Sequence, residues 1–295
     1  MNTFIMRNRF SRHCIAVLFT VVAFFSACNH SNDDGFFSSP NHVAPIEQPQ
    51  ESELPQPPLS DLPPVDPDIW DTANTDISHI APARKLIAFT FDDSPSRTLE
   101  NIFAVFAAFN EENPDCKASA TFFFNGGLFD SDTPQLLYAA CALGFELGNH
   151  TQSHADLTKL SKEELQSEID QTDELLKQAD GKPRHLLRAP FGKTNALVKE
   201  LSSTPIIDWT IDTLDWTGVC AEEIYQSVYY QRFSGAIVLM HDGYQNTVDA
   251  LKRLLPDLKA DGYQVVTVSQ LAKAHGCTLR RGKTYIRARK QPANA

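Results

Sequence analysis

The 295-residue sequence lacks several motifs that would assign it to a common class of protein. It has no G-x-S-x-G elbow, no P-loop and no H-E-x-x-H pair, which argues against serine hydrolases, P-loop nucleotide-binding proteins and zincin metalloproteases. We also find no internal repeat. Any chemistry in this chain must therefore come from residues that are scattered along it.

Apolar runs long enough to span a bilayer comfortably are scarce as well. Residues 14–25 are apolar but too few for a comfortable span. Three arginines precede them, namely Arg7, Arg9 and Arg12. A basic segment followed by a short apolar one predicts a signal peptide over residues 1–28.

The end of this segment, Phe25-Ser26-Ala27-Cys28, resembles a bacterial lipoprotein processing site. In that interpretation, which we favour, Cys28 becomes the lipidated first residue and anchors the protein to the cell membrane or the outer membrane, facing the periplasm or the exterior. The alternative is a plain secretory signal that is cleaved near Ala27. Both interpretations predict export.

Residues 29–80 contain no Lys or Arg, but they hold ten acidic residues and nine of the 18 prolines. Such a segment buries too little apolar surface to fold alone, so we predict a disordered linker. Where it is polyproline-like it extends by about 3.1 Å per residue, enough to hold a domain ~100 Å from a membrane.

Most of the net charge of −11 comes from this linker, and the rest of the chain is only mildly acidic. We therefore predict no nucleic-acid partner. Residues 278–295 are basic and are predicted to form a solvated tail. Nothing in the sequence indicates an oligomer, so a monomer is expected.

Four cysteines follow the linker: Cys116, Cys141, Cys220 and Cys277. Their spacing matches no zinc motif. An exported protein can pair some of them in disulfides, and free buried thiols are an equal alternative.

Residues 81–277 alternate between predicted strands and predicted helices. Strands are expected at residues 86–91, 118–124, 145–148, 185–188, 205–209, 236–240 and 265–268. Helices are expected at residues 98–110, 134–142, 161–178, 194–202, 221–232, 247–260 and 269–275, the third opened by a Ser161-Lys162-Glu163-Glu164 capping box. Alternating strands and helices predict an α/β fold with a parallel, barrel-like sheet of about seven strands.

Polar clusters follow five of these strands. They are Asp92/Asp93, His150/His154, the segment Arg188-Ala189-Pro190-Phe191-Gly192, Asp212/Asp215/Trp216, and Leu239-Met240-His241-Asp242. Because the carboxyl ends of parallel strands meet at one edge of the sheet, this recurrence predicts an active site there.

The first two clusters suggest a metal site. Neighbouring side chains near a strand end point different ways, so one carboxylate can bind a cation while the other stays free as a base. His150 and His154 are four residues apart and would face the same way on a helical turn. Two imidazoles and one carboxylate leave open positions on a metal, as catalytic zinc sites do. Either pair alone is weak, since acidic turns and surface histidine pairs are common.

The motifs TFDDSPS, HTQSH, RAPFG, DTLDW and LMHD, in this order between Thr90 and Asp242, resemble those of the polysaccharide deacetylase family, the NodB-homology carbohydrate esterases of family four. The similarity extends over residues 84–275. It implies a distorted (β/α) barrel that removes N- or O-acetyl groups from glycans with a divalent metal. Zinc is favoured, and cobalt or another divalent ion is an alternative.

The resemblance also implies roles for single residues. Asp93, His150 and His154 match the metal ligands. Asp92 matches the base that deprotonates the attacking water, and His241 matches the general acid that protonates the leaving group.

Other matched positions support these groups. Arg188 would keep Asp92 ionised, and Asp212 would hold His241 protonated. The backbone N–H of Phe191, after Pro190, would stabilise the oxyanion. Trp216 and Leu239 would receive the acetyl methyl group, although such residues at strand ends usually belong to the core.

Two positions depart from the family pattern. Ser94 stands where the family usually has Gly, which would cost on the order of 1 kcal/mol if the backbone there were left-handed. Phe191 stands where Tyr is frequent, which preserves a backbone contribution and removes a hydroxyl.

The leading hypothesis is an enzyme that hydrolyses carbon–nitrogen bonds in linear amides. Its substrate would be an N-acetylglucosamine-containing polysaccharide of the cell envelope, namely peptidoglycan, a chitin-like polymer or poly-N-acetylglucosamine. One alternative is an O-acetyl esterase on xylan or peptidoglycan. Another is a glycan-binding lipoprotein without catalysis.

Overall fold

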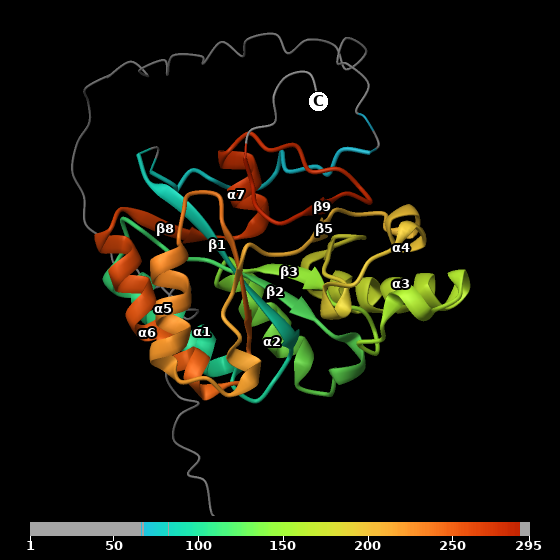
Figure 1. Ribbon diagram of the computed structural model, residues 1–295, viewed down its shortest axis with the longest axis horizontal. Helices are drawn as coiled ribbons and strands as arrows, with labels where there is room; N and C mark the ends of the chain where they lie inside the picture. Colours follow the sequence, from blue (N-terminus) through green and yellow to red (C-terminus); the bar gives the residue numbers. More distant parts are fainter. Residues whose placement is uncertain (1–65, 67, 82, 290–295) are drawn as a thin grey trace, which may run out of the picture. The chain divides into compact units, whose positions relative to one another are not determined.

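The computed structural model describes residues 66, 68–81 and 83–289. Its centre is one sheet of nine strands (Figure 1). The strands are β1 (Lys85–Ser94), β2 (Thr121–Phe124), β3 (Glu146–Asn149), β4 (Leu186–Leu187), β5 (Ile206–Ile207), β6 (Ile211–Asp212), β7 (Ile237–His241), β8 (Tyr263–Val266) and β9 (Thr284–Tyr285). The predicted signal peptide, its lipidated Cys28 and most of the predicted linker lie outside the described residues.

The strands follow the order β6-β7-β1-β2-β3-β4-β5-β9, and β8 pairs with the first half of β1. Every one of these pairings is parallel. The sheet curls into a half-barrel, which confirms the predicted distorted α/β barrel. It has nine strands and not seven, because β6 and β9 are two-residue strands that lie outside the apolar runs from which strands were predicted.

Seven α-helices surround the sheet in the part of the chain that the structure describes. They are α1 (Leu99–Glu112), α2 (Thr133–Ala142), α3 (Lys162–Asp180), α4 (Ala196–Leu201), α5 (Ala221–Gln231), α6 (Gln245–Ala260) and α7 (Val268–Ala274). Helices α1, α5 and α6 lie together along one side, and α3 and α4 lie at the other (Figure 1). Among these described helices, none is both long and apolar enough to cross a membrane.

Helix α3 shows how local sequence defines an element. Ser161 Oγ accepts a hydrogen bond from Glu164 N, and Glu164 Oε2 accepts one from Ser161 N, which confirms the predicted capping box. The helix ends before Gly181, whose φ of 73° is left-handed. Glycine adopts this conformation without steric cost, and so it stops the helix.

The longer strands β1, β2, β7 and β8 are buried on both faces, as expected for a parallel sheet covered on both sides. Along β1, Ile87, Phe89 and Phe91 face the core under α1 and α6. Leu86 and Ala88 face the opposite way, into the core beside α7. This period of two determines which side chains of β1 point into the half-barrel.

The core under α1 and α2 is built mainly from phenylalanines. Phe122 stacks on Phe91 with ring centroids 4.8 Å apart, and it contacts Phe103 and Phe145 edge-on or tilted at 5.2 and 5.0 Å. Such aromatic pairs contribute beyond the area that they bury. This packing supports the strand from which the site residues emerge.

The described part of the predicted basic tail has exposed side chains at Arg281, Lys283 and Arg287, but its backbone is not separate from the fold. β9 pairs with β5, Arg287 forms a bridge with Ala236, and Ala288 is buried. The backbone of this segment therefore pairs with β5 and with Ala236, and the small apolar side chain of Ala288 is buried.

The described end of the predicted linker also packs on the domain. Trp70 N donates to Leu279 O and its ring joins the core beside α7, while Lys273 Nζ donates to Ala73 O and Thr75 O. Asp66 pairs with Arg280 at 2.8 Å. Residues 68–80 are therefore ordered, because apolar Trp70 has a core to enter.

The four cysteines of the domain, namely Cys116, Cys141, Cys220 and Cys277, are free. Cys116 and Cys277 are buried, and burial raises the pKa of both thiols. The free-thiol alternative therefore describes this fold.

Candidate active site

Two carboxylates emerge at the carboxyl end of β1. Asp92 lies on the same side of the strand as Ala88 and Thr90, and it is buried. Asp93 would point the other way on a regular strand, but its φ of 64° is left-handed and turns the chain. This non-glycine residue in a strained conformation marks the end of β1 as a site rather than a plain strand end.

Ser94 departs from the family pattern without consequence for the backbone. It continues β1 and pairs with Phe124, and the left-handed residue is its neighbour Asp93. The cost that we expected for a left-handed serine therefore does not arise.

Asp93, His150 and His154 come together, with one ligand atom from each lying within 4.8 Å of the others. Asp93 Oδ1 is 3.7 Å from His150 Nε2 and 3.5 Å from His154 Nε2. His150 Nδ1 donates to the backbone oxygen of Arg188 at 2.7 Å, which leaves Nε2 as the unprotonated nitrogen facing Asp93. Two imidazoles and a carboxylate in this state fit a divalent metal such as zinc.

The two histidines do not share a helical turn, contrary to the prediction from their spacing. Residues 150–154 form an irregular loop in which Thr151 and His154 have φ of 71° and 57°. These left-handed residues bring the rings to a centroid distance of 4.9 Å. Asn125, which the sequence did not single out, donates to Asp93 Oδ1 at 3.2 Å.

Arg188 lies fully buried inside the half-barrel. Its Nη1 donates to Asp92 Oδ1 at 2.8 Å and to Thr90 Oγ1 at 2.6 Å, and its Nε donates to Ile207 O. Burial opposes ionisation of Asp92, but the Arg188 guanidinium, and after it His241, outweigh burial and hold the pKa of this carboxyl below its ordinary value.

His241 lies directly opposite Asp92 in the β1–β7 register. Its partner is Asp215 and not Asp212, which corrects the role expected from the resemblance. Asp215 Oδ1 accepts from His241 Nδ1 at 2.8 Å, and Asp215 Oδ2 accepts from His241 N and from Thr247 Oγ1. Burial lowers the pKa of His241, but the bond to Asp215 and the nearby carboxylates outweigh it and raise the pKa to about 9.

Asp212 has another contact. Its Oδ1 accepts a hydrogen bond from Leu214 N, which closes a turn around the left-handed Leu214. Asp215 begins the 3₁₀ helix Asp215–Thr217 after this turn and points back under β7. Asp212 is the last residue of β6 and Asp215 follows three residues later, so the sequence placed both in one cluster and had no signal that distinguished them.

The remaining predicted residues line the same end of the sheet to different degrees. Pro190 is buried at the start of the 3₁₀ helix Pro190–Gly192, and Phe191 is 60% exposed with its ring 4.7 Å from that of His154. Trp216 is 53% exposed, so it is not a core residue. Leu239 is buried within β7 opposite Thr90, as a core residue would be.

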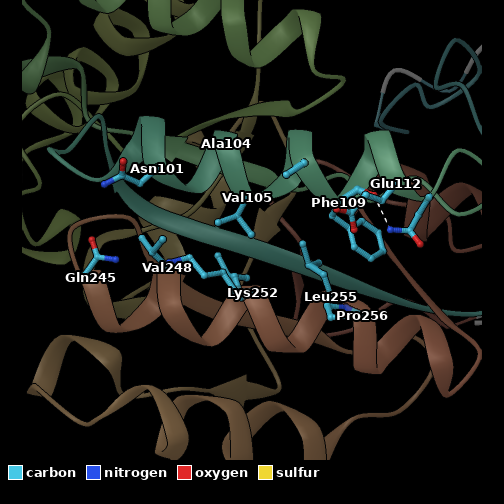
Figure 2. Close-up of a pocket in the computed structure, with 13 residues that line it drawn as sticks. Asn101, Ala104, Val105, Phe109, Glu112, Gln245, Val248, Lys252, Leu255 and Pro256 are labelled. Carbon is cyan, nitrogen blue, oxygen red and sulfur yellow. Dashed lines mark hydrogen bonds between the residues drawn. The ribbon is translucent and has the colours of Figure 1, made fainter. Parts of the chain in front are cut away.

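A groove of about 660 Å³ between α1 and α6 lies apart from these residues (Figure 2). Its floor is apolar, with Val105 and Phe109 from α1 facing Val248 and Leu255 from α6. The groove contains no cluster of histidines and carboxylates like the one at the strand ends.

Comparison with known proteins gives a consistent result. The sequence model of the family described as polysaccharide deacetylase matches residues 79–205. Over 206 residues the chain is 34% identical to the peptidoglycan-N-acetylglucosamine deacetylase PgdA of Listeria monocytogenes, which covers 70% of this chain and 42% of that protein. A peptidoglycan-N-acetylglucosamine deacetylase of Bacillus cereus is 32% identical over 213 residues, covering 69% of this chain and 92% of the relative.

Solved structures show the same similarity. The peptidoglycan deacetylase PdaC from Bacillus subtilis superposes with a TM-score of 0.61 at 32% identity, covering 66% of this chain and 93% of that one. The chain spans less than half the length of the Listeria relative and nearly all of the Bacillus cereus one.

Proposed function

This chain belongs to the polysaccharide deacetylase family, and from that premise we propose that it is a divalent-metal-dependent hydrolase that removes N-acetyl groups from a cell-envelope glycan. One observation carries the proposal. The Asp93–His150–His154 cluster lies beside Asp92 and His241, which are register partners on the adjacent strands β1 and β7. The pKa of Asp92 is lowered and that of His241 is raised, so the carboxylate is ionised and the imidazole is protonated.

Asp93, His150 and His154 would hold the metal, and their donor set favours zinc. A divalent ion bound there would lower the pKa of the attacking water and would polarise the acetyl carbonyl. His150 is prepared for this role because its Nδ1–H bond to Arg188 O fixes the tautomer.

Asp92 and His241 would carry the two proton transfers. Arg188 keeps Asp92 ionised, so this carboxylate accepts a proton from the attacking water. Asp215 keeps His241 protonated near neutral pH, so the imidazolium donates its proton to the departing nitrogen. The pKa values of Asp92 and His241 are thus shifted in opposite directions, and this difference assigns the role of base to Asp92 and that of acid to His241.

The surrounding residues would bind the acetyl group. The backbone N–H of Phe191, which follows Pro190, is the proposed donor to the oxyanion. Trp216 presents an exposed indole and Leu239 a buried side chain at the same strand ends, and together they would form the wall for the methyl group.

The protonated state of His241 favours amide over ester hydrolysis, because a departing amine needs a proton more than a departing alcohol does. The relatives named for peptidoglycan support peptidoglycan as the first glycan to test, with chitin-like polymers and poly-N-acetylglucosamine next. We further propose export by the segment 1–28 and lipid anchoring at Cys28, with the protein acting as a monomer at the envelope.

The decisive experiment measures acetate release by the full chain from peptidoglycan, chitin oligomers, poly-N-acetylglucosamine and acetylated xylan. Metal-free, zinc-loaded and cobalt-loaded protein are compared with Asp92→Asn. A matched control is Asp249→Asn, which removes an exposed carboxylate paired with Lys252 on α6. We expect metal-dependent release that Asp92→Asn loses and Asp249→Asn keeps; metal-loaded protein inert on every glycan would refute the proposal.

A further inference from the structure

The loop that carries both histidines of the cluster is strained. Thr151 and His154 are non-glycine residues in the left-handed region, where L-amino acids rarely lie. Such conformations persist only where the surrounding structure imposes them. The neighbours of residues 151–154 therefore determine where the His154 ring lies.

The two histidines differ in how they are held. His150 is buried, and its own ring is fixed by the 2.7 Å bond to Arg188 O. The His154 side chain is 32% exposed and contacts the exposed ring of Phe191. The position of His154 thus depends more strongly on its backbone.

The first half of the loop is held by the segment after β2. Gly126 N donates to Thr151 O at 3.1 Å, and Gly127 N donates to Gln152 O at 2.6 Å. A Cβ at position 127 would lie 2.5 Å from Gln152 O, so this close approach requires glycine. These contacts stop at Gln152, two residues before His154.

Ser153, the residue before His154, is held by Glu168 of α3. Glu168 accepts three hydrogen bonds: its backbone oxygen from Gln152 N at 2.9 Å, its Oε2 from Ser153 N at 2.8 Å and its Oε1 from Ser153 Oγ at 2.6 Å. Hydrogen bonds to an ionised carboxylate are stronger than neutral ones. Both carboxylate oxygens are thus used to fix the residue that immediately precedes His154.

We propose that Glu168 is a positioning residue that holds His154 in its metal-binding place through Ser153. This inference rests on the proposed metal site. Glu168 itself would contact neither metal nor substrate, and it acts by making the left-handed loop the only stable arrangement. Its loss should therefore lower metal affinity, while the chemistry in metal-saturated protein persists.

The expected size follows from other metal sites, in which removal of a group that orients a ligand costs about 10–100-fold in affinity. Glu168→Ala frees both Ser153 donors and should weaken zinc and cobalt binding by about tenfold. Glu168→Gln keeps one acceptor oxygen, and its amide can donate to the Ser153 hydroxyl, so this variant should restore most of the affinity.

The test is calorimetric titration of metal-free full chain with zinc and with cobalt, together with thermal melting of the metal-free protein. Glu174→Ala is the matched control, because it removes an exposed carboxylate from the same helix, where it pairs with Lys177. We expect weakened binding in Glu168→Ala, near-normal binding in Glu168→Gln and Glu174→Ala, and similar melting of all four proteins.

Wild-type affinity in a folded Glu168→Ala protein would overturn the positioning role while leaving the metal site intact. Failure of the wild-type chain to bind either metal would overturn the metal site as well. If Glu168→Ala does not fold, Ser153→Ala removes the hydroxyl bond to Glu168 alone and should weaken metal binding by a smaller factor. Unchanged metal affinity in Ser153→Ala would then overturn the inference.

Discussion

Replacing Asp215 by Asn should lower the pKa of His241 and move the basic limb of the activity profile to lower pH. The pKa of His241 is about 9 against an ordinary value of 6.5. That difference corresponds to about 3.4 kcal/mol in favour of the protonated imidazole. The bond to Asp215 is the largest contribution that opposes burial, so without its charge the pKa should fall by more than about one unit.

Asparagine suits this test because it keeps the shape of the site. Its side-chain oxygen can still accept from His241 Nδ1, as Asp215 Oδ1 does at 2.8 Å, while the negative charge is lost. The His241 pKa is measured by NMR titration of the ring in metal-free protein. The same change is followed in kcat/KM against pH for the metal-loaded enzyme, where activity falls as His241 loses its proton.

Asp212→Asn is the control for the same prediction. Asp212 lies three residues earlier and accepts from Leu214 N, so its replacement should leave the basic limb in place. An unchanged His241 pKa in Asp215→Asn, or a basic limb that moves in Asp212→Asn instead, would refute our assignment of the His241 partner.

Three further predictions concern the support of the site. Arg188→Met leaves Asp92 buried without its guanidinium, so unfolding free energy should fall by about 3–5 kcal/mol in urea denaturation and the acidic limb of kcat/KM should move to higher pH. Phe122→Ala removes the centre of the aromatic core and should cost about 3–5 kcal/mol by the same measurement, with little change in metal affinity. Burial lowers the pKa of His185, but hydrogen bonds to Asp173 and Asp180 outweigh burial and raise the pKa above 6.5. The stabilisation by protonated His185 is then complete below pH 6.5 and lost as pH rises through the raised value, so His185→Gln should remove this part of the pH dependence of unfolding.

Long elements with strong patterns could be predicted from sequence. The strand predicted at residues 86–91 lies within β1, and the capping box at Ser161 opens α3 as expected, since continuous apolar runs and side-chain caps are local signals. The two-residue strands β6 and β9 could not be predicted, because neither is an apolar run and their pairing with β7 and β5 depends on the tertiary fold. The equally short β4 and β5 could be predicted from the apolar pairs Leu186-Leu187 and Ile206-Ile207. Trp70 likewise joins a core that the composition of its own segment does not reveal.

The candidate site divides in the same way. The residue types and their placement after strands are properties of the sequence, and they brought Asp92, Asp93 and His241 to one edge. The position of His154 beside Asp93 could not be predicted from the sequence, because it depends on a loop with left-handed residues that is hydrogen-bonded to Glu168 of α3.

By itself the sequence determined the α/β alternation, the polar groups at the strand ends and the family, because each of these depends on residue order and local periodicity. Only the tertiary structure decided that Asp215 rather than Asp212 holds His241, and that the tail and the end of the linker complete the domain. Aspartates three residues apart have the same chemistry, and only the turn between them and the burial of one beneath β7 select the partner.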